Sequence, residues 1–218
     1  MKKILIYGDS NVNGRNFITT ASIPEDMQWS GLLVDELSDI KIYKNGLAGR
    51  LAGNYEKINT LRNGREDFLA SFKKYAPFDI IIIALGTNDL QVKFKRSALD
   101  ICEDLYWYKE VLYKMFENNK LKNKYFNEDF PTFIYLSPVK VDYKRLGKMF
   151  NAHSNQVREE LNEIAINNLD NYLILDNVEL FLDGIHLSSN GHKEVAKKLE
   201  RVIKKEFVRW LNKFLFEI

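Results

Sequence analysis

Short, continuous apolar runs recur along the chain and are separated by longer segments of helical spacing. The runs are mainly continuous, with Lys41 as the one polar residue inside them, and differ from the regular apolar–polar alternation of a strand with one solvated face. The runs are Ile4–Tyr7, Ile40–Tyr43, Ile80–Leu85, Phe133–Leu136 and Tyr172–Leu175. This pattern is typical of strands buried on both faces of a parallel sheet.

The segments between the runs carry apolar residues three or four positions apart, which predicts amphipathic helices. They are Trp29–Leu37, Leu61–Phe72, Leu99–Phe116, Val157–Ala165 and Val195–Phe214. Alternation of strand and helix predicts right-handed crossovers and an α/β fold. We therefore expect a three-layer α/β/α sandwich around a five-stranded parallel sheet, with residues 1–218 forming a single domain.

The composition agrees with one domain that has a substantial core. The 218 residues are 45% hydrophobic and 28% charged, which suits a globular domain. The net charge is +2, and because the charges alternate in sign, no surface for nucleic acid is expected. The single cysteine, Cys102, excludes an internal disulfide framework and a Cys-based zinc cluster.

The sequence also argues against a membrane partner. No segment approaches the roughly 18–20 continuous apolar residues of a membrane span, and Ile4–Tyr7 is too short for the apolar region of a signal peptide. We therefore expect a cytoplasmic protein. The aromatic C-terminal segment 207–218 leaves two alternatives open, which are packing on the sheet and formation of a homo-oligomer.

Four polar loops that contain glycine follow the predicted strands. They are Gly8–Asn11, Asn45–Arg50, Gly86–Asp89 and, after a short spacer, Asp183–His186. The carboxyl ends of parallel strands lie at one edge of the sheet, where ligand-binding residues gather in open α/β folds. We therefore expect these four loops to lie together.

The loops contain the residue types that acyl transfer requires. Ser10 is a weak nucleophile at neutral pH and needs a base within hydrogen-bond reach, for which His186 is the best candidate. Asp183, three residues earlier, can orient the imidazole and stabilise its charged form. The candidate oxyanion donors are the backbone N–H groups of Ser10 and Gly49 and the side-chain amide of Asn88.

With these loops, the sequence resembles the SGNH, or GDSL-type, esterase and lipase family over nearly its whole length. The stretches GLAGR, PFDIIIIALGTNDL and DGIHLSSNGH are similar to those of the arylesterase and carbohydrate-deacetylase branch. The resemblance implies the flavodoxin-like strand order 2-1-3-4-5, the triad Ser10, Asp183 and His186, and the oxyanion donors named above. Two positions depart from the pattern: Asn11 replaces the leucine of the GDSL motif, and Leu51 follows GR where that branch often has threonine.

The expected substrate is a small-molecule ester, with acetyl as the acyl group. The segments between the motif loops are short and charged, so they offer no apolar lid or channel for a long acyl chain. Asn11, Leu90 and Ile185 are the expected substrate contacts. No cofactor is expected, because Asp9 and Asp89 are predicted to brace their loops by accepting hydrogen bonds from backbone N–H groups.

Other functions stay open at this point. A magnesium-dependent phosphohydrolase could use Asp9, Asp89 and Asp183 as oxygen ligands. A non-catalytic module could bind a sugar or an acyl group in the same pocket. His192 could act as the base in place of His186, although it lacks a carboxylate at matching spacing. Neither a P-loop motif nor the G-x-S-x-G nucleophile elbow occurs.

Overall fold

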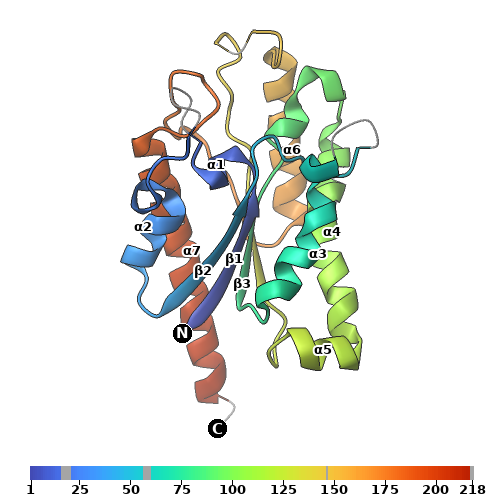
Figure 1. The fold of residues 1–218 in the computed structure, drawn as a ribbon, viewed down its shortest axis with the longest axis vertical. Coiled ribbons are helices and arrows are strands. Elements are labelled where there is room, and N and C mark those ends of the chain that lie inside the picture. Colours follow the sequence, from blue (N-terminus) through green and yellow to red (C-terminus); the bar gives the residue numbers. More distant parts are fainter. Residues whose placement is uncertain (16–20, 56–59, 146, 217–218) are drawn as a thin grey trace.

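Five parallel strands form one sheet with helices on both faces (Figure 1). The structure is a computed structural model that describes residues 1–15, 21–55, 60–145 and 147–216, with the side chains of these residues up to 209 apart from that of residue 60. The strands are β1 (Lys2–Gly8), β2 (Ile40–Gly46), β3 (Ile80–Ala84), β4 (Thr132–Leu136) and β5 (Tyr172–Leu173). Their order is β2-β1-β3-β4-β5, which confirms the predicted sandwich and its flavodoxin-like topology.

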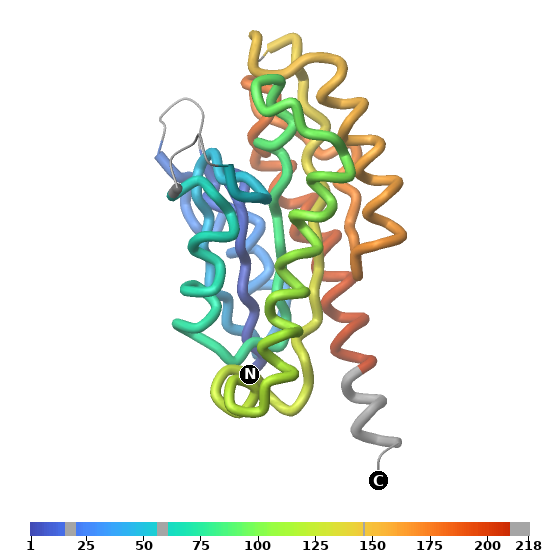
Figure 2. The backbone as a smooth tube through the Cα atoms, turned by 90° about the vertical axis from the view of Figure 1, so that its right-hand side faces the viewer, coloured from blue at the N-terminus to red at the C-terminus, as the bar shows by residue number. Residues whose placement is uncertain are grey.

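Two groups of helices cover the two faces of the sheet. On one face are α2 (Trp29–Glu36) and α7 (Ser189–Phe216), and on the other are α3 (Gly64–Tyr75), α4 (Ala98–Glu117) and α6 (Ala152–Asn168) (Figure 1). Figure 2 shows α4 and α6 side by side. The short helices are α1 (Ser10–Asn13) and α5 (Asn119–Tyr125), and the 3₁₀ turns are Glu25–Met27, Thr60–Arg62, Asn88–Leu90 and Val92–Phe94.

The two central strands carry the most deeply buried part of the core. Ile4 and Ile6 of β1 and all four isoleucines of Ile80–Ile83 in β3 have no exposed surface. Strand β1 pairs with β2 and β3, and Gly8 at its end stands opposite Gly46 on one side and Ala84 on the other. The loops that follow these three strands therefore start at the same level of one sheet edge.

Several predicted boundaries differ from the observed ones, and two of them have a clear local cause. The ladder of β5 ends at Leu173 because the backbone N–H of Leu175 instead donates to Oγ of Ser137 at 2.8 Å. Helix α3 begins at Gly64, and Leu61 lies before it in a 3₁₀ turn with 69% of its surface exposed. In both places the local backbone geometry sets the boundary of the strand or helix, and the hydropathy pattern does not reveal that geometry.

The last helix follows the predicted stripe, and Val195, Leu199 and Ile203 are completely or almost completely buried on the side that faces the core. The side chains from Trp210 onward lie outside the described residues, so homo-oligomer formation through this segment stays an expectation. Within the described ranges, no helix has both the length and the apolar character that crossing a membrane requires.

Candidate active site

The first loop places Ser10 at the carboxyl edge of the sheet. Strand β1 ends at Gly8, where a Cβ atom would lie 2.5 Å from the carbonyl oxygen of Ala84, so only glycine allows this close approach to β3. Asp9 then caps α1, because its Oδ1 accepts a hydrogen bond from the N–H of Asn11 at 2.9 Å. Ser10 is the first residue of α1 and is 7% exposed.

Ser10, His186 and Asp183 form a continuous chain of hydrogen bonds. Nε2 of His186 lies 2.9 Å from Oγ of Ser10, and Nδ1 lies 2.5 Å from Oδ2 of Asp183. Oδ1 of Asp183 accepts from the backbone N–H groups of Ile185 and His186, both at 3.1 Å. An aspartate acceptor at Nδ1 places the imidazole proton there, which leaves Nε2 to accept the serine proton.

The carboxyl group of Asp183 is held in its charged form. Burial alone raises the pKa of Asp183, but the hydrogen bonds from His186 and Ile185 outweigh burial and bring the pKa below its usual value. Asp183 is therefore ionised at neutral pH and can stabilise an imidazolium on His186.

The predicted oxyanion donors lie on the loops after β1, β2 and β3. Gly49 has φ +80°, and a Cβ there would lie 3.3 Å from Nε of Arg62, so both the left-handed backbone and the tight space favour glycine. Among the described residues, the N–H groups of Ser10 and Gly49 have no hydrogen-bond partner. Both groups are therefore free to donate to a ligand.

The amide of Asn88 has a defined orientation. Its Nδ2 donates to the carbonyl oxygen of Arg50 at 3.1 Å, and its Oδ1 accepts from Nε2 of Gln91 at 3.1 Å. The second hydrogen of Nδ2 has only a long contact of 3.4 Å with Oδ2 of Asp9. Asn88 therefore presents its donor edge toward the loop that contains Gly49.

Arg50 is a residue of the site that the sequence reading missed. Its side chain is 2% exposed, and the guanidinium carbon lies 4.1 Å from the ring centroid of Tyr7. It donates to the carbonyl oxygens of Gly8 at 3.0 Å and Asn45 at 2.8 Å, which ties together the ends of β1 and β2. The only signal was an arginine in the loop GLAGR, and sequence alone does not distinguish a buried arginine from an exposed one.

The three expected substrate contacts lie in or next to the loops that carry Ser10, Asn88 and His186. Leu90 and Ile185 are 4% and 8% exposed, so they offer little surface to a substrate. Asn11 uses both ends of its side-chain amide in hydrogen bonds to the loop of His186. Contact between these residues and a substrate stays a prediction.

The two remaining aspartates of the loops brace the backbone, as predicted. Asp9 accepts from Asn11, and Oδ2 of Asp89 accepts from the N–H of Ala52 at 2.9 Å. Burial raises the pKa of Asp9 to about 6 and the pKa of Asp89 to about 7. No group of three or more Asp, Glu, His or Cys residues in the described part of the chain is arranged to hold a metal ion. The ligand set of the phosphohydrolase alternative is thus not brought together there.

His192 is not placed to act as the base. It is 2% exposed, and its Nδ1 accepts a hydrogen bond from the backbone N–H of Trp29 at 3.2 Å. Burial, with the nearby charges of Lys44 and His186, lowers the pKa of His192 to about 4. The residue is therefore a neutral acceptor in the wall behind α1.

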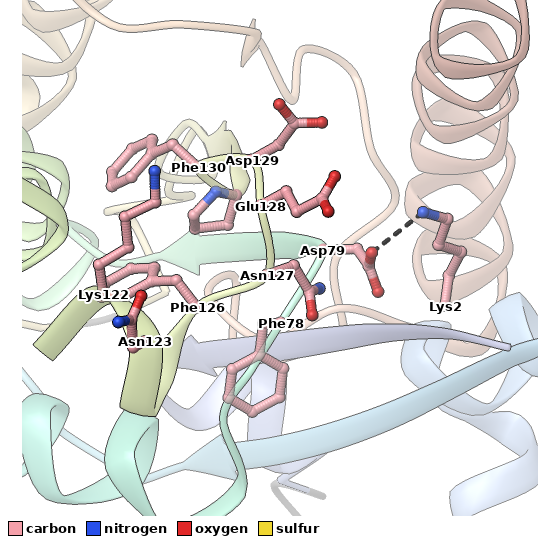
Figure 3. A pocket seen from close by; sticks show the side chains of 11 residues that line it. Lys2, Phe78, Asp79, Lys122, Asn123, Phe126, Asn127, Glu128, Asp129 and Phe130 are labelled. Carbon is pink, nitrogen blue, oxygen red and sulfur yellow. Dashed lines mark hydrogen bonds and ion pairs between the residues drawn. The ribbon is translucent and has the colours of Figure 1, made fainter. Parts of the chain in front are cut away.

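A large cavity lies at the opposite, amino edge of the sheet (Figure 3). It has a volume of about 750 Å³, and its wall includes Phe78, Phe126 and Phe130 together with the ion pair of Lys2 and Asp79 at 3.0 Å. Among the described residues that line it there is no serine, cysteine or histidine. It therefore lacks the hydroxyl or thiol nucleophile and the histidine base of a serine- or cysteine-type hydrolase.

Comparison with known families agrees with the geometry at the carboxyl edge. The profile of the GDSL-like lipase/acylhydrolase family matches residues 4–199. The chain belongs to this family. It is accordingly a carboxylic ester hydrolase. Among curated proteins, no sequence match to the chain was found.

Several solved structures share the fold of this family member. The aryl esterase of M. Smegmatis has a TM-score of 0.77 at 21% identity, over 94% of this chain and 99% of that one. A carbohydrate acetylesterase family member from Sinorhizobium meliloti has a TM-score of 0.77 at 23% identity, over 94% and 98%. A lipase/acylhydrolase from Enterococcus faecalis has a TM-score of 0.64 at 17% identity, over 94% and 97%.

Proposed function

We propose that the protein is a serine esterase that hydrolyses small acyl esters, with acetyl as the preferred acyl group. The observation that carries the proposal is the hydrogen-bonded chain from Asp183 through His186 to Ser10, with distances of 2.5 and 2.9 Å. It supplies a nucleophile, a base and an ionised group that orients the base. No metal or other cofactor enters the reaction.

In the first half of the reaction, Oγ of Ser10 attacks the carbonyl carbon of the ester while Nε2 of His186 accepts the hydroxyl proton. The carbonyl oxygen becomes an oxyanion that accepts hydrogen bonds from the N–H groups of Ser10 and Gly49 and from Nδ2 of Asn88. When the tetrahedral intermediate collapses, the bond to the alcohol oxygen breaks, and this oxygen takes the proton from His186.

In the second half, a water molecule attacks the acyl group on Ser10 and gives one proton to Nε2 of His186. The second tetrahedral intermediate uses the same three donors. Its collapse releases the carboxylic acid and returns the proton to Oγ of Ser10. Asp183 stays ionised throughout and stabilises the imidazolium formed in each half.

The preference for a small acyl group is supported by the close packing beneath the loop that carries Ser10. The cavity lined by Asp9, Asn11, Leu187 and neighbouring residues has a volume of about 20 Å³. That is room for about one water molecule. A long acyl chain therefore cannot enter the core beneath this loop.

A series of p-nitrophenyl esters tests the proposal. We expect kcat/KM to be highest for acetyl or propionyl and to fall by at least about tenfold by octanoyl, because the gain of roughly 0.8 kcal/mol per buried methylene is not available. Equal or better turnover of octanoyl would contradict the acyl preference.

The same assay after dialysis against EDTA tests the alternative mechanism. The esterase mechanism predicts unchanged activity. Loss of activity that Mg²⁺ or Mn²⁺ restores would instead favour a metal-dependent hydrolase.

A further inference from the structure

The side chain of Asn11 joins the nucleophile helix to the loop that carries His186. Its Nδ2 donates to the carbonyl oxygen of Ile185 at 3.2 Å, and its Oδ1 accepts from the N–H of Leu187 at 2.9 Å. The two partners are the residues directly before and after His186. Asn11 itself directly follows Ser10.

This pair of bonds has the pattern of a parallel β-ladder. In such a ladder one residue donates its N–H to the carbonyl before the opposite residue and accepts from the N–H after it. The amide of Asn11 presents a donor and an acceptor side by side on one edge, as the N–H and C=O of a single strand residue do. It therefore takes the place of a neighbouring strand opposite His186 and defines the direction of the backbone on both sides of that residue.

The backbone of Asn11 is itself anchored. Its N–H donates to Oδ1 of Asp9 at 2.9 Å, and its carbonyl oxygen accepts from Nε1 of Trp29 at 3.1 Å. Trp29 is 1% exposed, and its own N–H donates to His192. The link from α1 to the histidine loop thus starts from a buried, hydrogen-bonded base.

We propose that Asn11 is a positioning residue that holds His186 at hydrogen-bond distance from Ser10. The proposal rests on the proposed function. Ser10 and His186 are 176 positions apart in sequence, and the amide of Asn11 makes a direct connection between their two segments. Leucine, which the GDSL motif has at this position, could make neither bond. In this chain the position next to the nucleophile therefore acts on the base and not on the substrate.

The substitution Asn11→Leu removes both bonds at similar side-chain volume. We expect kcat for p-nitrophenyl acetate to fall about 100-fold with KM changed less than about twofold, since a displacement of about 1 Å in a catalytic group costs rate of this order. The matched control is Asn118→Leu, which removes two side-chain bonds to backbone N–H groups at the start of α5. The control should keep wild-type kcat.

A second variant covers the case in which Asn11→Leu fails to fold. Asn11→Asp keeps the acceptor for Leu187 and places a carboxylate beside the histidine loop. Because this variant loses the donor to the carbonyl oxygen of Ile185 and keeps the acceptor for Leu187, we expect kcat to fall by about tenfold, between wild type and Asn11→Leu, with KM changed less than about twofold. A purely structural role would lower the melting temperature and leave kcat of the folded protein at the wild-type value.

The possible results distinguish a positioning role of Asn11 from a role in substrate binding. The proposal is overturned if folded Asn11→Leu keeps kcat within about threefold of wild type, if only KM rises, or if folded Asn11→Asp has the kcat of the wild type. A KM effect alone would make Asn11 a substrate contact. The proposed function fails separately, if the wild-type protein hydrolyses none of the esters and phenylmethylsulfonyl fluoride does not label Ser10.

Discussion

Polar side chains are largely exposed at the amino edge of the sheet and buried at its carboxyl edge. At the amino edge, charged residues such as Lys122 and Glu128 are partly or fully exposed around a cavity of about 750 Å³. At the carboxyl edge, Asp9, Asn88 and Asp183 are 2%, 7% and 5% exposed. Asn88 bonds to Asp9 and Arg50 of other loops, and Asp183 bonds to His186 within its own loop. The chemical groups thus gather where polar atoms are buried against one another, and the size of a cavity is a poor guide to them.

The difference between the edges also has an energetic side. Asp9 and Asp89 stay buried although burial raises the pKa of both carboxyl groups. Oδ1 of Asp89 has no hydrogen-bond partner in the described part of the chain. Buried carboxyl groups with raised pKa values lower the free energy of unfolding at neutral pH. The carboxyl edge therefore lowers the stability of the fold in a way that the exposed charges of the amino edge do not.

The strongest test of this comparison is Ser10→Ala. We expect loss of at least about 1000-fold in kcat for p-nitrophenyl acetate, since the variant has no nucleophile. The melting temperature should stay within a few degrees of wild type because only one hydroxyl is removed. Retention of more than about a hundredth of the activity would mean that the carboxyl edge is not the site of reaction.

A smaller effect is expected from Asn88→Ala. The amide is needed when the oxyanion forms, so kcat should fall by roughly 100- to 1000-fold while KM changes less. Steady-state kinetics with a short acyl ester measure both constants. An increase in KM at constant kcat would instead assign Asn88 to substrate binding.

The third prediction concerns how Asp89 makes the stability of the fold depend on pH. Burial and the nearby charges of Asp104 and Asp9 raise the pKa of Asp89 to about 7. The folded pKa lies above the unfolded value, so this group stabilises the fold below pH 4 and loses that contribution as the pH rises to 7. We expect the melting temperature to fall over this range by roughly 2–4 °C for each kcal/mol lost.

The variant Asp89→Asn provides the control, because its side chain does not titrate. Its melting temperature should depend less on pH between 4 and 7 than that of the wild type. Calorimetric scans across this range compare the two proteins. Equal slopes would show that Asp89 is ionised in the folded protein at these pH values.

The smallest effect is expected at the amino edge. The double substitution Lys122→Gln with Glu128→Gln changes two charges of that cavity while it leaves every bond of the catalytic loops in place. We expect kcat/KM within about twofold of wild type. A loss of tenfold or more in a protein of normal melting temperature would show that the amino edge takes part in the reaction.

The alternation of strands and helices and the loops that carry Ser10, Asp183 and His186 were predictable because they depend on local patterns, whereas the strand order came from the family resemblance. Apolar runs identify the buried strands, and the loops after them are located by those runs. The roles of Asn11 and Arg50 were not predictable, because each depends on contacts with segments far away in sequence. The end of β5 depends on one hydroxyl, that of Ser137, which periodicity does not reveal.

The separation of the proposed triad along the chain bears on how activity appears during synthesis. Ser10 leaves the ribosome before the base to which it bonds, which is 176 residues downstream. At translation rates of about 5–20 residues per second, the nucleophile waits roughly 10–35 s for its histidine. The central strands can assemble in that interval, yet the nascent protein has no base for the serine. Turnover of an ester is therefore expected only from chains synthesised past His186, and termination upstream of that residue leaves no partially active product.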